Sequence, residues 1–264
     1  MPSNRSPWYE QCAVAWRCGL TLFLYVSCLS IGADAARADM VIERTRVIYP
    51  EGRRDVQVNL SNTSVDSATF VQLWLDDGTD NPDIEAISVP FLLSPPTARV
   101  APNGRQAVRL AFTGEPQKPD QESLFYFNML ELPPRYTGPD DVARLTFARR
   151  TRIKMFFRPK GLKGDQLQAM KQLQCSPSKV DGDWTLECYN PSGFHLSFFG
   201  FSLGNVGEKV NANDQGGMIK PLERAQFALK GYDKLPQPLT TLAVDYVNDY
   251  GAVTTLESTL KAKP

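Results

Sequence analysis

The sequence has 264 residues, in which 29 lysines and arginines balance 29 aspartates and glutamates. This length suits one large domain or two domains of modest size. The even balance of charge argues against a broad surface for nucleic acid or for anionic membranes.

The first 38 residues have the organisation of a secretory signal peptide. Arg5 and Arg17 precede an apolar run over residues 18–32, and the small residues of Ala36–Ala38 match a signal-peptide cleavage site. The run is shorter than the roughly 20 residues that span a membrane, although an uncleaved anchor is the alternative. We expect cleavage after Ala38, export of the chain, and no membrane insertion of the chain afterwards. The part that remains is close to neutral, because the peptide takes away three arginines and two acidic residues.

Strand-like segments follow one another up to residue 132. Val56, Val58 and Leu60 alternate with polar residues, and this period of two is typical of a β-strand with one wet face. Such segments recur every 8–15 residues, separated by glycine, proline or asparagine. The expected strands cover residues 39–49, 56–60, 69–75, 89–93, 98–100, 106–112 and 123–132.

The most distinctive segment is Asp141–Pro159. Its odd positions from Ala143 to Phe157 are mostly apolar, and its even positions are mostly basic or polar. At about 3.3 Å per residue, a strand over residues 142–157 would span about 50 Å, far more than a usual strand of about five or six residues. We therefore expect part of it to lie at a sheet edge that recruits a partner strand. The alternative is a long core strand that bends between two sheets.

The segment Arg158–Gly164 is interpreted as a linker, because proline and glycine both end strands. No part of the chain shows a sustained helical period with caps. The sequence thus predicts an all-β protein with two sandwich domains, residues 39–160 and 161–264. The strands expected in the second domain cover residues 185–189, 196–203, 226–229, 242–247 and 252–256.

Three of the five cysteines lie in the predicted signal peptide, which leaves Cys175 and Cys188. An even pair of cysteines in an exported chain predicts a disulfide. Two buried free thiols are the alternative.

One short motif suggests enzyme chemistry. Gly200–Gly204 matches the nucleophile elbow of hydrolases, with Ser202 as the nucleophile, but that motif needs a strand-to-helix turn and a later histidine. The single histidine, His195, comes before Ser202 and has no second histidine or nearby cysteine for a metal site. Phosphate-binding and dinucleotide-binding motifs are absent from the sequence. We therefore expect a glycine-bounded strand here, no enzyme activity, no metal and no cofactor.

Eight fragments of the sequence form a recognisable set when they are taken together in this order. They are Glu43–Pro50, Gln72–Trp74, Ser94–Pro96, Glu122–Asn128, Leu132–Pro134, Thr151–Pro159, Asn190–Ser192 and Val247–Gly251. This set resembles the periplasmic pilus-assembly chaperones of the PapD-like family and covers nearly the whole chain after residue 38. The resemblance implies two immunoglobulin-like sandwiches arranged in an L, and a location in the periplasm.

The resemblance implies that the last strand of the first domain completes the sandwich of a pilus subunit that lacks one strand. This mode of recognition is donor-strand complementation. The donor strand would be Val142–Thr151, and its donated apolar side chains would be Ala143, Leu145 and Phe147. Arg149 occupies the next position of the series, where the chain departs from the apolar pattern.

Two sets of charged residues match the family as well. Arg46 and Lys154 would hold the C-terminal carboxylate of the subunit through charge-assisted hydrogen bonds. Glu122, Arg158 and Asp249 would form a salt bridge between the domains.

The function expected from this resemblance is a chaperone that binds pilus subunits and delivers them to an outer-membrane usher without ATP. The alternative is an exported two-domain adhesin or structural surface protein, which would have no reason to grip a carboxylate. The sequence leaves open whether the free chain pairs with itself through its edge strand as a self-capping dimer.

Overall fold

The computed structural model describes most of the chain that follows the predicted signal peptide. The signal peptide lies outside the described residues and stays a prediction. Within the described residues, no helix is long and apolar enough to cross a membrane. The structure describes residues 40–79, 87–114, 118–132, 147–180, 182–205, 208–213, 216–229 and 241–259.

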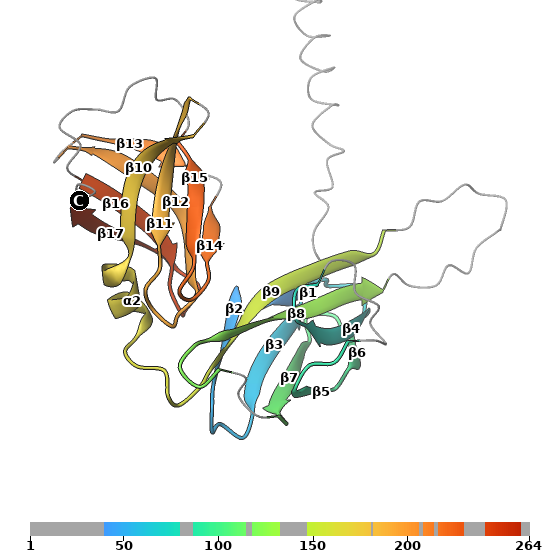
Figure 1. Cartoon of the computed structure of the whole chain (residues 1–264). Coiled ribbons are helices and arrows are strands. Elements are labelled where there is room, and N and C mark those ends of the chain that lie inside the picture. The colour runs from blue at the N-terminus through green and yellow to red at the C-terminus, as the bar shows by residue number, and fades with distance from the viewer. Residues whose placement is uncertain are drawn as a thin grey trace, which may run out of the picture. The chain divides into compact units, whose positions relative to one another are not determined.

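The described chain up to residue 158 consists of strands and connecting loops. It forms two sheets, one in the order β1-β3-β7-β5 and one in the order β2-β9-β8-β4-β6 (Figure 1). The strands are β1 (Met40–Ile42), β2 (Arg46–Pro50), β3 (Val56–Asn62), β4 (Thr69–Asp76), β5 (Phe91–Ser94), β6 (Thr97–Val100), β7 (Arg105–Phe112), β8 (Ser123–Leu132) and β9 (Arg149–Arg158).

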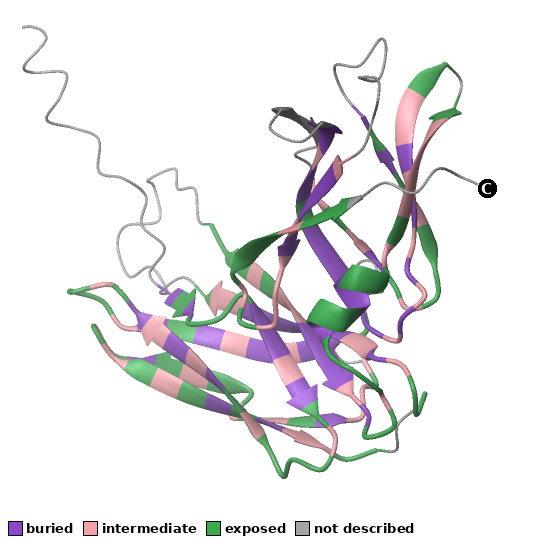
Figure 2. Cartoon of the chain, turned by 90° about the vertical axis from the view of Figure 1, so that its left-hand side faces the viewer, coloured by how far each residue is buried: buried purple, intermediate pink, exposed green. Residues whose placement is uncertain are grey.

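Alternating side chains of these two sheets meet in one hydrophobic core, and buried and exposed residues alternate along the strands in Figure 2. Tyr49 joins the two sheets. It is fully buried, stacks on Phe157 at 5.9 Å between ring centroids, and its hydroxyl accepts a hydrogen bond of 2.9 Å from the Phe112 amide. The same hydroxyl donates to the Arg53 carbonyl at 3.0 Å. This polar contact satisfies a phenol that the core would otherwise leave without a partner.

The prediction of one continuous strand over residues 39–49 is wrong. β1 pairs with β3, whereas β2 pairs in parallel with β9 in the other sheet. The exposed polar residues Glu43–Thr45 separate them, and the Glu43 amide donates to the Asn59 carbonyl at 3.0 Å. The chain changes sheet here because three consecutive exposed residues break the alternation that a single strand requires.

The distinctive segment of the sequence provides β9. Met155 and Phe157 face the core, as their parity predicts, and Arg150 and Arg152 lie on the other face of the sheet. The part of the predicted strand before residue 147 lies outside the described residues. Within the described residues, β9 pairs with β8 from Arg149 to Phe157, but with β2 only from Lys154 to Arg158.

The second half of the described chain forms a second pair of sheets and a separate hydrophobic core. The sheet orders are β10-β11-β15 and β13-β12-β16-β17, with β14 also paired to β12. β10, β13 and β14 had no counterpart in the prediction. The strands are β10 (Gln174–Val180), β11 (Asp183–Tyr189), β12 (Leu196–Asn205), β13 (Glu208–Asn213), β14 (Gly217–Ile219), β15 (Arg224–Ala228), β16 (Thr241–Val247) and β17 (Val253–Thr259).

One helix had no counterpart in the prediction. A short helix, α2 (Gln166–Gln172), follows the linker and packs Ala169 and Met170 into the second core. The Asp165 side chain caps it by accepting a hydrogen bond of 2.8 Å from the Gln168 amide. A helix of seven residues is too short to establish a hydrophobic period in the sequence.

The hydrolase-like motif lies inside a strand. Gly200–Gly204 belongs to β12, and Ser202 is paired with Ala243 of β16. No strand-to-helix turn is formed at this serine, so the interpretation of the motif as a strand is confirmed.

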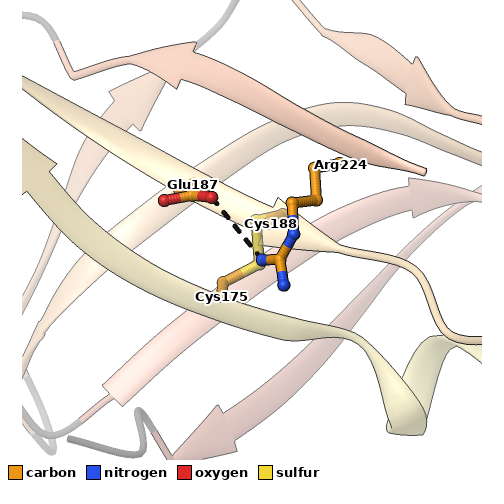
Figure 3. Close-up of a disulfide and its surroundings, with 4 residues drawn as sticks. All are labelled: Cys175, Glu187, Cys188 and Arg224. Atoms are coloured by element: carbon orange, nitrogen blue, oxygen red, sulfur yellow. Dashed lines mark ion pairs between the residues drawn. A yellow bond between two sulfur atoms is a disulfide. The ribbon is translucent and has the colours of Figure 1, made fainter. Parts of the chain in front are cut away.

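Cys175 and Cys188 are joined by a disulfide. They lie directly opposite each other on β10 and β11, with their Cα atoms 4.1 Å apart. Figure 3 shows the disulfide with the neighbouring ion pair, in which Arg224 Nη1 lies 3.5 Å from Glu187 Oε1. The bond ties β10, an outer strand of its sheet, to the strand beside it.

Replacing both cysteines by alanine should lower the free energy of unfolding by about 3 kcal/mol, because the crosslink restricts the unfolded chain. Urea unfolding followed by circular dichroism checks this. A reducing agent should lower the stability of the wild-type chain by a similar amount and leave the double variant unchanged. Equal urea midpoints for the oxidised wild type and the double variant would contradict the expectation.

Candidate functional site

Arg46 and Lys154 are direct partners in the parallel pairing of β2 with β9. Their sequence neighbours Val47 and Met155 are fully buried in the first core. Because side chains alternate across a strand, Arg46 and Lys154 point to the opposite face of this sheet. Two residues that are 108 positions apart in the sequence therefore form one pair of cations.

Arg46 is buried, with 7% of its surface exposed. Its Nη1 donates to the Val247 carbonyl at 2.9 Å, and its guanidinium lies 5.7 Å from the centre of the Phe156 ring. Its Nε is buried without a hydrogen-bond partner in the described part of the chain. No carboxylate among the described residues makes an ion pair with Arg46. The guanidinium thus keeps hydrogen-bonding capacity that the protein itself does not use.

Lys154 is similarly short of partners. Its Nζ lies 3.5 Å from Ser197 Oγ, at the limit of a hydrogen bond. Burial lowers the pKa of Lys154, and the charge of Arg46 lowers it further. Burial also lowers the pKa of Arg46, while Asp249 and Glu122 partly oppose the shift. An anion bound between the two cations would favour their charged forms.

Glu122, Arg158 and Asp249 are brought together in a charged network. Arg158 Nε lies 2.6 Å from Glu122 Oε1, and its two terminal nitrogens each donate to an Asp249 oxygen at 2.6 Å. Arg158 is the last residue of β9, Glu122 precedes β8, and Asp249 follows β16. The network therefore joins the strands of the first half to a turn of the second half.

Glu122 also holds His195. Its Oε2 accepts a hydrogen bond of 2.7 Å from the His195 amide and lies 3.3 Å from His195 Nδ1. His195 is buried and packs against Phe156 at 5.5 Å between ring centroids. The described residues contain no group of metal-binding side chains. His195 is thus a buried residue of this network, a role that its isolated position in the sequence did not indicate.

The turn Asn248–Gly251 places Asp249 beside β2. Asn248 Oδ1 accepts hydrogen bonds from the amides of Tyr250 and Ala252, at 3.0 and 3.1 Å. Gly251 has a φ of +86°, and a side chain there would collide with Thr45, the residue before Arg46. The turn therefore needs asparagine and glycine at these positions to bring the Asp249 carboxylate to Arg158.

The predicted donor strand is described only at its end. Ala143 and Leu145 lie outside the described residues. Phe147 lies two residues before the start of β9 and is 76% exposed. Arg149 lies 3.1 Å from Glu131 Oε1 through its Nε, and its Nη2 donates to the Met40 carbonyl at 3.4 Å. The apolar series thus gives way at Arg149 to an ion pair with the neighbouring strand.

Sequence reasoning missed a second charged cluster on β9. Arg150 and Arg152 both pair with the buried carboxylate of Asp76 on β4. The alternation of basic residues along β9 was visible in the sequence. The partner was not visible, because Asp76 lies more than 70 positions away and nothing local marks it as a neighbour.

Comparison with known proteins agrees with this architecture. The model for the N-terminal domain of PapD, a pili and flagellar-assembly chaperone, matches residues 39–163. The model for the C-terminal domain of the pili assembly chaperone PapD matches residues 168–258. The chain is 37% identical over 245 residues to the chaperone protein HifB of Haemophilus influenzae, which covers 88% of this chain and 92% of HifB.

Solved structures give the same result. The crystal structure of the YadV chaperone has a TM-score of 0.70 and 31% identity, and covers 84% of this chain and 100% of that chain. The CupB2 chaperone of Pseudomonas aeruginosa has a TM-score of 0.68 and 31% identity, with the same coverage. The chain therefore belongs to the PapD family of pilus-assembly chaperones, a family of chaperones rather than enzymes. The predicted all-β fold with two sandwich domains is confirmed.

Replacing Glu122 by glutamine should lower the free energy of unfolding by about 3–5 kcal/mol, as for a broken buried pair, because an amide cannot accept from both Arg158 and the His195 amide. Replacing Asp249 by asparagine should lower it by only about 1 kcal/mol, since this side chain is 29% exposed. Urea unfolding at neutral pH measures both variants. Equal losses would show that burial does not set the strength of these pairs.

Replacing Lys154 by methionine should raise the free energy of unfolding at pH 7 by about 0.5–2 kcal/mol. Folding lowers the pKa of Lys154, so the folded state holds this proton less tightly than the unfolded state. The gain should shrink as the pH rises through the lowered pKa toward the ordinary value of 10.5, because the folded wild type then loses the proton. Thermal or urea unfolding across this pH range tests the sign.

The matched control for this experiment is Lys163→Met, at an exposed position in the linker before α2. Its stability should stay within about 0.5 kcal/mol of the wild type. A Lys154→Met variant that is less stable than the control at pH 7 would contradict the expectation.

Proposed function

We propose that the chain is a periplasmic chaperone that holds the C-terminal carboxylate of a pilus subunit between Arg46 and Lys154. The observation that carries this proposal is the pairing of two cations on one sheet face without a carboxylate partner among the described residues. A guanidinium offers two parallel donors to a carboxylate, and an ammonium adds a point charge. The carboxylate at a free C-terminus can enter such a site, because no further backbone follows it. A side-chain carboxylate within a chain would require the backbone on both sides of it to fit as well.

The same subunit would pair with the edge of β9. Over Arg149–Ile153, β9 has a hydrogen-bonded neighbour on one side only, among the residues that the structure describes. Backbone hydrogen bonds to this edge would give affinity that depends little on the subunit sequence, and donated side chains would give the fit. The exposed Phe147 supports this role, because transfer of a large aromatic ring from water into a partner's apolar groove is favourable.

The charged network would fix the position at which the C-terminus of the subunit binds, because it positions Arg46. Arg158 holds the turn that carries Asp249, and the neighbouring Val247 carbonyl accepts from Arg46. This arrangement positions the Arg46 side chain from both halves of the chain. The proposed division into domains 39–160 and 161–264 agrees with two hydrophobic cores that share no residue.

Export and delivery complete the proposed function. The disulfide between Cys175 and Cys188 suits an oxidising compartment such as the periplasm, and the predicted signal peptide would direct the chain there. The relative HifB is named a chaperone protein, which supports the same role for this chain. The chaperone would deliver the subunit to an outer-membrane usher. Replacement of its donor strand by the strand of another subunit would then complete the folding of the subunit and drive its release.

The test is co-expression of the chain with a candidate pilus subunit, followed by size-exclusion chromatography and measurement of the dissociation constant. Arg46→Ala and Lys154→Ala should each weaken binding by about 2–5 kcal/mol. Arg109→Ala is the matched control, because this exposed arginine lies on β7 in the other sheet. A subunit extended by two glycines should bind the wild type as weakly as the native subunit binds the variants.

Two outcomes would change the proposal. A complex that survives both substitutions would remove the carboxylate anchor and leave a general binder of β-strands. A stable chain that binds no pilus subunit would favour the adhesin alternative.

A further inference from the structure

The carbonyl oxygen of Val247 accepts two side-chain hydrogen bonds, one from each half of the chain. Arg46 Nη1 donates to it at 2.9 Å, and Gln166 Nε2 donates to it at 3.1 Å. A carbonyl oxygen has two lone pairs, so these two donors can occupy both of them. The carbonyl of Val247 therefore connects the buried guanidinium to a glutamine that no motif of the sequence marked.

Gln166 is a buried polar residue at the first position of α2, with 7% of its surface exposed. Its backbone is held in place, because the Asp165 side chain caps the helix and because Ala169 and Met170 pack into the second core. A buried amide in a fixed position restricts the group to which it donates. Here that group is the Val247 carbonyl, and through this carbonyl the amide acts on Arg46.

The bond from Gln166 limits how many donors of Arg46 the protein itself can use. With one lone pair of the Val247 oxygen taken, the oxygen can accept from only one nitrogen of the guanidinium. Among the described residues, Arg46 Nε is buried and has no hydrogen-bond partner. Without Gln166, the same oxygen could accept from a second nitrogen, and the guanidinium would turn toward the protein. Gln166 thus keeps donors of Arg46 available for an anion.

An amide suits this position better than a carboxylate would. Glutamate has nearly the same shape as glutamine, but its ionised side chain cannot donate to a carbonyl. Because Arg46 and Gln166 reach the same oxygen, a carboxylate in place of the amide would lie close to the guanidinium and pair with it. Glutamine positions the guanidinium without neutralising it.

We propose that Gln166 is a positioning residue of the carboxylate anchor. By taking one lone pair of the Val247 carbonyl, it holds Arg46 in the orientation that presents the remaining N–H groups to the C-terminal carboxylate of a subunit. This inference rests on the proposed function, and it assigns a further residue to the same site. Gln166 acts through Arg46 and needs no contact with the ligand. Helix α2 of the second half thereby contributes to a site whose two cations belong to the first half.

The hydrogen bond from Gln166 could also serve only to attach α2 to the end of β16. Loss of the bond would then lower the stability of the fold and affect every ligand to the same extent. A positioning role acts only on a ligand that carries the C-terminal charge. Two ligands that differ in this charge alone therefore separate the two roles.

The test uses two fluorescent peptides of alternating valine and serine, each of about ten residues, the length of a long strand. One ends in a free carboxylate and the other in a carboxamide. Fluorescence anisotropy with the full exported chain, at neutral pH and low salt, gives both dissociation constants. The wild type should prefer the carboxylate peptide by at least about tenfold. Gln166→Met keeps the volume and removes the donor, so it should weaken the carboxylate peptide about fivefold and leave the carboxamide peptide within about twofold.

Gln166→Glu provides a second test, which also covers the case in which Gln166→Met does not fold. It should weaken the carboxylate peptide more than Gln166→Met does, because the new carboxylate would compete with the ligand for Arg46. Gln172→Met is the matched control, since this exposed glutamine lies at the other end of α2. The control should keep the preference of the wild type.

The outcomes separate this inference from the carboxylate anchor. Equal weakening of both peptides in Gln166→Met would assign Gln166 to the attachment of α2 and overturn the proposal. An unchanged preference in the Gln166 variants, with loss of the preference in Arg46→Ala, would overturn the positioning role and leave the anchor. A wild type that binds both peptides equally, or binds neither, would overturn the anchor and this inference with it.

Discussion

The positive charge of Arg46 is the constraint on which this structure depends. This buried guanidinium has no carboxylate partner among the residues that the structure describes, so it raises the free energy of the folded state, and its lowered pKa reflects that cost. The fold tolerates it because the Val247 carbonyl accepts one of its hydrogen bonds and the network of Glu122 and Asp249 lies close enough to offset part of the charge. The fold accepts this lower stability, and under the proposed function the guanidinium is thereby left available for an anion.

One strand unites the features that surround this charge. The odd residues of β9 from Ile153 to Phe157 pack into the first core. Its even residues include Arg150, Arg152 and Lys154, and its last residue, Arg158, holds the turn that contains Asp249. The period of two along a strand makes this division of tasks possible, because neighbouring residues face opposite sides. A register shift of one residue would bury the cations and expose the core side chains.

Much of this could be predicted from local patterns. The bounds of β8 were predicted over residues 123–132, and those of β4 to within one residue. The change of sheet between β1 and β2, the helix α2 and the strand β10 were missed. In each case the local signal is weak: three polar residues, a helix of seven residues, and a strand that contains Pro177 and is mostly polar. Such short segments take their structure from what they pack against.

The sequence by itself determined most of the strand segments, which of their faces are apolar, and which charged residues match the chaperone family. These properties depend on neighbours along the chain, and the alternation of side chains records them directly. Only the tertiary structure decided that Lys154 lies beside Arg46, that Glu122 holds His195, and that Asp76 holds Arg150 and Arg152. Those contacts join residues dozens of positions apart. Strand order and register create them, and no local pattern encodes which carboxylate will meet which cation.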